Sequence, residues 1–215
     1  MVVLGLVLAL LLACCCASYT QCNHTSIVDN FSFAQPRKTF QQKYYVLNND
    51  CSLSTTARNA MLVYTGNEGP IEGFIANSQF LETLAASLGA DLVFIEHRYY
   101  GTSQPFDPIY YQHLSSTQAL ADFAAIITHL QPTPKFVVAA GGSYGGMLAA
   151  WMRVKYPSIV GAAYAASAPL QGGSLQHYTA NPELKTQLYQ VVADAMPPTC
   201  QAVRGLYSLI IAVTS

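Results

Sequence analysis

Charged residues are scarce in this chain of 215 amino acids: they make up 10%, where about 25% is usual for a globular protein. The ten Lys and Arg residues nearly balance the eleven Asp and Glu residues, which argues against a nucleic-acid partner, because such binding needs a clustered basic face. Low-complexity polar tracts are absent too, which excludes a disordered chain. With 52% hydrophobic residues, the sequence predicts one globular domain with a large core.

The first 17 residues are typical of a secretory signal peptide. Residues 2–13 form an uninterrupted apolar run that is too short to cross a bilayer, which takes about 20 residues. Small residues follow, and cleavage is expected after Ala17, although no Lys or Arg stands near the start. A buried core helix and a lipoprotein signal ending at Cys14 are the alternatives. We therefore expect entry into the secretory pathway and no stable membrane anchor.

Cysteines are few, and none has the spacing of a metal site. Cleavage of the leader leaves an odd number of them: Cys22, Cys51 and Cys200. Cys22 and Cys51 are the nearer pair, but the sequence alone does not fix the pairing. Two glycosylation sequons, which begin at Asn23 and Asn30, agree with an oxidising, glycosylating route. We expect no metal and no cofactor.

Short strand-like runs alternate with helical segments in the rest of the chain. Strands are predicted at residues 40–47, 61–65, 92–96, 136–140 and 159–165, the last three apolar throughout, as in strands buried on both faces. Helices are predicted at residues 78–88, 118–130, 145–156 and 181–196, the first two capped by Asn77 and Thr117. This order predicts an α/β fold, with a mainly parallel sheet, helices on both faces and chemistry at the carboxyl ends of the strands.

The strongest motif is a G-x-S-x-G sequence, Gly141 to Gly145, that joins a predicted buried strand directly to a helix. On so sharp a turn any Cβ at the flanking positions would clash, which explains the glycines. The turn raises the Ser143 hydroxyl above the sheet and lets the backbone N–H of Tyr144 face a developing oxyanion. We therefore predict that Ser143 is a nucleophile.

Two further motifs follow neighbouring strands. The loop Gly66 to Gly69 is predicted to supply the second oxyanion donor, with Asn67 and Glu68 offering polar groups to a substrate. Glu96-His97-Arg98-Tyr99 ends the next strand, on the same edge of the sheet. For His97 a hydrogen-bonded structural role or a place in the pocket wall is favoured over that of general base, and Arg98 and Tyr99 are candidates for the pocket rim. The remaining polar candidates are predicted to be surface residues: Asp122, His113 and His129.

These motifs, in this order, resemble the serine exopeptidases that include lysosomal Pro-X carboxypeptidase, dipeptidyl peptidase II and thymus-specific serine protease. The matching segments run from about residue 28 to about residue 200, and the longest of them are residues 64–69, 96–106, 118–123, 141–157 and 165–169. The resemblance implies an α/β-hydrolase domain with a helical cap, and peptide substrates with proline or a small residue beside the cleaved bond. Ser143 carries over as the nucleophile, Tyr144 as an oxyanion donor, and Asn67 and Glu68 as the wall of the same site. A lysosomal, vesicular or extracellular destination follows.

A serine nucleophile needs a histidine that takes its proton and an acid that orients this histidine. After Ser143 the only candidates are His177, Glu183 and Asp194, in an order reversed from that of the fold, and all lie in the predicted cap. We divide the chain into a leader (1–17), the first part of a hydrolase domain (18–170), the start of a cap (171–205) and an atypical apolar tail (206–215). The family's acid and histidine are expected beyond Ser215, so that this chain alone would fold poorly and turn over little peptide.

Two other functions also fit the sequence. G-x-S-x-G also fits an esterase or lipase of the same fold, although the two flanking loops argue against it. A secreted product without catalysis could instead bind a peptide through the incomplete site.

Overall fold

The computed structural model describes residues 18–48, 50–51, 53, 58–107, 109–131 and 135–170. The chain divides into two compact units, 1–168 and 169–215, and nearly all described residues belong to the first. The predicted leader, cap and tail lie outside the described residues, as do the helix predicted at residues 181–196 and His177, Glu183, Asp194 and Cys200.

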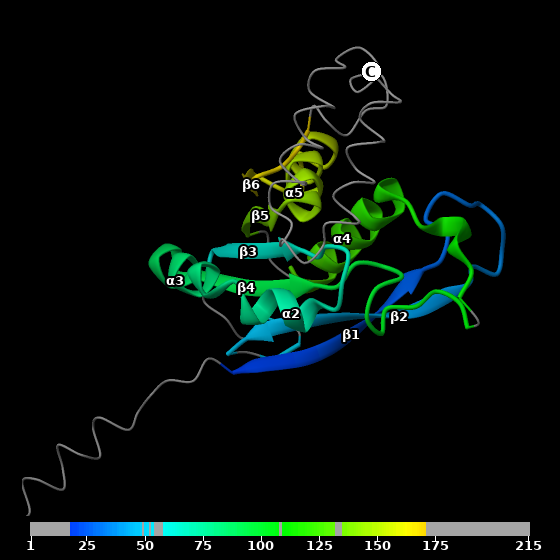
Figure 1. Ribbon diagram of the computed structural model, residues 1–215, viewed down its shortest axis with the longest axis horizontal. Coiled ribbons are helices and arrows are strands. Elements are labelled where there is room, and N and C mark those ends of the chain that lie inside the picture. The colour runs from blue at the N-terminus through cyan, green and yellow to red at the C-terminus, as the bar shows by residue number, and fades with distance from the viewer. Residues whose placement is uncertain are drawn as a thin grey trace, which may run out of the picture. The chain divides into compact units, whose positions relative to one another are not determined.

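A six-stranded sheet forms the centre of the described part, in the order β1-β2-β4-β3-β5-β6 (Figure 1). Its strands are β1 (Tyr19–Ile27), β2 (Thr39–Leu47), β3 (Ala60–Thr65), β4 (Ala90–Ile95), β5 (Phe136–Gly142) and β6 (Ala162–Ala166). The helices are α2 (Ile71–Ala76), α3 (Gln79–Leu88), α4 (Ser116–Leu130) and α5 (Tyr144–Lys155), with a 3₁₀ turn, η1, at Tyr111–His113. The pairs β4–β3, β3–β5 and β5–β6 are parallel, whereas β1–β2 and β2–β4 are antiparallel.

Both faces of the sheet are covered by helices, which confirms the predicted α/β fold. Alternate residues of the central strands point to opposite sides. One core packs strand residues such as Val63 and Val93 with Phe123 of α4 and Leu148 of α5. The other core packs alternate residues of the same strands against α2 and α3. The strand residues are Leu62, Tyr64, Leu92 and Phe94, and the helix residues are Ile71 of α2 and Leu81 and Ala85 of α3.

Several details of the predicted elements are wrong, and α2 was not predicted as a helix. Asn77 ends α2 instead of capping the next helix, and Ser78 precedes α3. The cap of α4 is Ser115, not Thr117, and its side chain accepts a hydrogen bond from the backbone of Gln118. β6 starts three residues later than predicted and is mostly exposed, because within the described residues it pairs with β5 alone.

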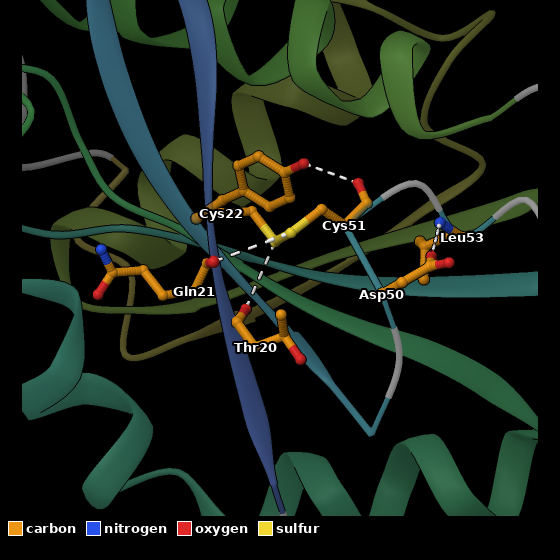
Figure 2. The surroundings of a disulfide bond; sticks show 7 residues. Thr20, Gln21, Cys22, Asp50, Cys51 and Leu53 are labelled. Carbon is orange, nitrogen blue, oxygen red and sulfur yellow. Dashed lines mark hydrogen bonds between the residues drawn. A yellow bond between two sulfur atoms is a disulfide. The ribbon is translucent and has the colours of Figure 1, made fainter.

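A disulfide joins β1 to the segment that follows β2 (Figure 2). It links Cys22 to Cys51, the nearer pair noted in the sequence, across 29 residues, and the hydroxyl of Tyr44 donates to the carbonyl oxygen of Cys51 (2.7 Å). Closing a loop of that length stabilises the fold by about 3 to 4 kcal/mol if the effect is chain entropy. β1 was not predicted as a strand, because its sequence is mostly polar, and it is tied into the fold by this disulfide and by β2.

Candidate active site

Ser143 lies on the sharp turn between β5 and α5, as the sequence predicted. Its backbone has φ 55° and ψ −124°, a conformation that costs a residue with a side chain of order 1–3 kcal/mol. Two hydrogen bonds hold it: the Ser143 N–H donates to the carbonyl of Ala166 (3.0 Å), and its carbonyl accepts from Met147 (3.0 Å). The side chain is exposed. A strained backbone thus presents an accessible hydroxyl at the N-terminus of a helix.

The glycines on either side of Ser143 are required by close contacts. A Cβ on Gly141 would collide with the backbone carbonyl group of Gly145. A Cβ on Gly145 would collide with the side chain of Asn67 and would lie 2.7 Å from the carbonyl oxygen of Thr65. The spacing of the motif is therefore a packing requirement of this turn, as predicted from the sequence.

The loop after β3 is joined to this turn by side-chain hydrogen bonds. Asn67 is 5% exposed, and its Nδ2 donates to the carbonyl of Gly142 (2.7 Å), while its Oδ1 accepts from the hydroxyl of Tyr64 (2.9 Å). The Thr65 hydroxyl lies 2.7 Å from the carbonyl oxygen of Gly145. The side chain of Asn67 therefore positions the turn and is not offered to a substrate. Tyr64 and Thr65 were missed, although both stand at the carboxyl end of a buried strand, where such contacts are expected.

Glu68 differs from its neighbour because it is exposed. Its negative charge is one of the causes that raise the pKa of Tyr64 and of Tyr144, each to about 12, and in both cases burial is the larger cause. Glu68 is therefore an exposed carboxylate close enough to Tyr64 and Tyr144 to act on both, and its place in a substrate site stays a prediction.

Tyr144 begins α5, and its backbone N–H belongs to the first turn of the helix, where no intrahelical acceptor exists. Its side chain is held by His97, whose Nε2 lies 3.1 Å from the Tyr144 hydroxyl. The Nδ1 of His97 is 2.7 Å from the carbonyl oxygen of Arg98, which can only accept, so Nδ1 carries the proton.

Burial lowers the pKa of His97 to about 4. The ring is therefore neutral near pH 7, and its Nε2 accepts from the hydroxyl of Tyr144. His97 is 1% exposed. This geometry supports the hydrogen-bonded role that the sequence favoured and leaves no function for His97 as a general base.

Arg98 does not lie on a pocket rim, because it is completely buried. Its Nε and Nη2 bind the two carboxylate oxygens of Asp122, both at 2.6 Å. The remaining N–H groups donate to backbone carbonyls of Ile27, Val28 and His113, so all five donors have acceptors. Asp122 is also buried, which makes its predicted surface location wrong. The pair joins the end of β1 to α4 and is part of the framework.

Tyr99 is also buried, at 6% exposure, and its hydroxyl accepts from the backbone N–H of His113 (3.2 Å). The neighbouring Glu96 is fully buried as well: its carboxylate accepts from the Ser103 hydroxyl (2.7 Å) and pairs with Lys43 (3.0 Å). The motif Glu96 to Tyr99 therefore shapes the sheet edge from inside, where a buried charge must be paired to be tolerated.

A pocket of about 220 Å³ lies beside the turn that carries Ser143. Gly141 and Gly142 form one side of it, and aromatic rings from α3 and β6 contribute much of the rest: Phe80 and Tyr164, whose ring centroids are 5.6 Å apart. The other lining residues are Tyr64, Asn77, Ser78, Leu81 and Ala166. A small apolar group would fit there. Among the described residues, no cluster of His, Cys, Asp and Glu could hold a metal ion.

The sequence model of the serine carboxypeptidase S28 family matches residues 26–194. The chain belongs to this family. Mouse (Mus musculus) lysosomal Pro-X carboxypeptidase is 49% identical over 154 residues, which cover 66% of this chain and 30% of that protein. Prolyl carboxy peptidase like protein 5 of Caenorhabditis elegans is 44% identical over 155 residues, with the same coverage. The chain thus spans about a third of the length of these S28 relatives.

Solved structures agree on the fold. VinJ superposes with a TM-score of 0.56 at 15% identity, and the proline iminopeptidase of Mycobacterium smegmatis with 0.53 at 17%. Each match covers 90% of this chain and 56% of the solved one. At these identities they establish the α/β-hydrolase fold alone. No helix in the described part of this S28 chain is long and apolar enough to span a bilayer.

Proposed function

We propose that the chain supplies the nucleophile, the oxyanion donors and one substrate pocket of a serine exopeptidase that cleaves peptides beside proline or another small residue. The observation that carries the proposal is the strained, exposed Ser143 on a glycine-flanked turn in a chain of the S28 family. Membership of a peptidase family favours this reading over the esterase alternative.

The Ser143 hydroxyl would attack the carbonyl carbon of the scissile bond and form an acyl-enzyme, which water then hydrolyses. Negative charge develops on the carbonyl oxygen, and the N–H of Tyr144 is the first candidate to bind it. In the loop after β3, the N–H groups of Gly66 and Gly69 donate to the carbonyls of Ile95 and Asn67. The N–H groups of Asn67 and Glu68 are therefore the candidates for the second donor.

The proton acceptor for Ser143 has to come from outside the described residues. His97 is neutral, buried and hydrogen-bonded at both ring nitrogens. The described histidines other than His97 have contacts elsewhere: His24 with Ser26 and His129, and His113 with Phe106 and Arg98. We place the histidine and acid of the triad in the part of the S28 relatives that this chain does not span.

Preference for proline is supported by the pocket beside the turn. Its volume of about 220 Å³ and the aromatic rings of Phe80 and Tyr164 suit a compact apolar ring. Two relatives are named for prolyl or Pro-X carboxypeptidase activity, in agreement with this choice. The disulfide between Cys22 and Cys51 supports an oxidising compartment, and with the lysosomal relatives we propose the secretory pathway and a lysosomal destination.

A chimera tests the proposal. Residues 18–168 of this chain, which include β1 and the disulfide between Cys22 and Cys51, would replace the corresponding N-terminal part of mouse lysosomal Pro-X carboxypeptidase, which supplies the rest. We expect the chimera to hydrolyse a peptide with a penultimate proline, and Ser143→Ala to abolish turnover without changing secretion or thermal stability. A folded chimera that remains inactive, or an active Ser143→Ala variant, would contradict the proposal.

A further inference from the structure

Two N-glycosylation sequons lie close together, but the structure gives their asparagines different surroundings. Asn23 is on β1, and Asn30 is on the segment between β1 and β2. Both sequons have the required Asn-x-Ser/Thr pattern, so the pattern alone would assign a sugar to each.

Asn23 points away from the protein. Side chains alternate along β1, with Cys22 and Ser26 buried and Asn23 and Thr25 exposed. In the described residues β1 pairs only with β2, so Asn23 lies on the edge strand of the sheet. An oligosaccharide on its Nδ2 would extend into solvent and displace no contact of the fold.

Asn30 has its side chain turned onto α4. Its Nδ2 lies 2.9 Å from Oδ1 of Asp122, and 3.1 and 3.3 Å from Oε1 and the carbonyl oxygen of Gln118. The backbone N–H of Asn30 also donates to Oε1 of Gln118 (2.9 Å). Gln118 is 7% exposed and Asp122 is 1% exposed. Both hydrogens of the Asn30 amide therefore point at acceptors on one helix.

A sugar on Asn30 would replace one of these hydrogens. Whichever hydrogen is replaced, a hydrogen bond is lost and the sugar ring is forced into α4. Asp122 cannot move aside, because it is held by Arg98 at two points, 2.6 Å each. The lost bond would leave a buried acceptor, the Asp122 carboxylate or the Gln118 side chain, without one of its donors, which is unfavourable.

We propose that the folded protein carries an N-linked oligosaccharide on Asn23 and none on Asn30. In the transfer, Nδ2 of Asn23 forms a bond to the anomeric carbon of a lipid-diphosphate-linked oligosaccharide. The bond from that carbon to the diphosphate oxygen breaks, the lipid diphosphate leaves with the electron pair, and one amide proton is lost. The sugar then covers the exposed side of β1 and blocks pairing of this edge strand with other chains.

Folding, not access to the transferase, selects between the two sites. In the unfolded chain both sequons are exposed. A chain modified at Asn30 cannot dock the segment after β1 onto α4, so it does not reach the protease-resistant state. Asn30-linked sugar is therefore expected only in the unfolded, retained pool.

The test is expression of the 215-residue chain in a glycosylating eukaryotic host, with the protease-resistant fraction, expected to be small, isolated from medium and cells. Peptide mass spectrometry after enzymatic removal of N-glycans in heavy-oxygen water then marks each modified asparagine. We expect complete marking at Asn23 and none at Asn30 in the folded pool. Sugar on Asn30 in folded protein, or an unmodified Asn23, would overturn the proposal.

Matched variants, each of which changes one sequon, separate the two sites. In the folded pool, Thr25→Ala should abolish the shift in electrophoretic mobility that glycan removal causes, and Asn23→Gln should do the same. Ser32→Ala should leave that shift unchanged. Ser32→Thr keeps the sequon at Asn30 and should still give folded protein with no sugar there. Loss of the shift in Ser32→Ala, or a doubled shift in folded Ser32→Thr, would contradict the assignment.

Discussion

The side-chain amide of Asn67 donates to the carbonyl oxygen of Gly142 across 2.7 Å, and so joins the loop after β3 to the turn that carries Ser143. Both parts of the proposed oxyanion site are held together by this contact. The Tyr64 hydroxyl holds the Asn67 side chain in place, because this hydroxyl donates to Oδ1 of the same amide.

Replacing Asn67 by Ala is expected to loosen the turn. The carbonyl of Gly142 and the hydroxyl of Tyr64 lose their partners, which costs about 1–3 kcal/mol per buried group left unsatisfied. Urea unfolding should show this loss of stability. In the chimera, Asn67→Ala should lower kcat by a larger factor than it raises KM. Asn59→Ala, which removes an exposed amide, is the control. Equal stability of the two variants would show that the amide does not hold the turn.

The pair Arg98 and Asp122 should be sensitive to loss of either member. Asp122→Ala leaves a guanidinium buried without its carboxylate, and we expect about 3–5 kcal/mol of destabilisation by urea or thermal unfolding. Arg98→Lys should also be destabilising, since three donors replace five. Asp107→Asn, at an exposed carboxylate, is the control. A mild effect of Arg98→Lys would mean that charge alone, and not the fork of donors, is needed.

Stability should fall on acidification because of His97. Its pKa is lowered from 6.5 to about 4 in the folded protein, so between those values the unfolded chain binds more protons. The stabilisation is fully present above pH 6.5 and is lost progressively as the pH falls towards 4, by at most about 3 kcal/mol.

Unfolding free energies measured from pH 7 to pH 4 check this expectation. His97→Gln should flatten the slope in that window and also lower stability at pH 7, because contacts of the ring with Tyr144 and Arg98 are lost. The pKa of His24 is also lowered, by burial and by the charge of His129. The slope measured for His24→Gln is therefore compared with that of His97→Gln. An unchanged slope in His97→Gln would show that another group titrates there.

The pocket beside Ser143 should control preference at the cleaved bond. Phe80→Ala removes one aromatic wall, and in the chimera we expect KM for a prolyl substrate to rise about tenfold, as for one aromatic contact of roughly 1.5 kcal/mol. An alanyl substrate should be affected less, so that discrimination falls. Leu88→Ala, at the exposed end of the same helix, is the control. If Phe80→Ala left the preference for the prolyl over the alanyl substrate unchanged, this pocket would not be the site that binds the proline.

Local patterns predicted much of this structure. A Cβ on Gly141 would meet only Gly145 and Gly146, so the need for this glycine was readable from the motif, whereas Gly145 is required by contacts with the distant Thr65 and Asn67. The apolar runs of β4 and β5 likewise indicated strands buried on both faces, because their own side chains are what the cores bury, but the same expectation was wrong for β6, which is mostly exposed.

Interactions between distant residues were not readable. Asp122 looked like a surface residue because its partner, Arg98, is 24 positions away and on a different element. Asn67 looked available to a substrate because nothing local shows that Gly142 takes its amide. β1 is polar in sequence, and its place depends on a disulfide and on pairing with β2.

The central claim is that Ser143 is the nucleophile and that its base comes from elsewhere in the family's fold. The most direct test of this claim is the rate at which a fluorophosphonate labels Ser143. Peptide mass spectrometry would locate the adduct in both the chimera and the 215-residue chain. We predict stoichiometric labelling of Ser143 in the chimera, and labelling at least about a thousandfold slower in the chain alone, because no histidine among the described residues can activate Ser143. Labelling at another residue, or equally fast labelling of both proteins, would contradict the account.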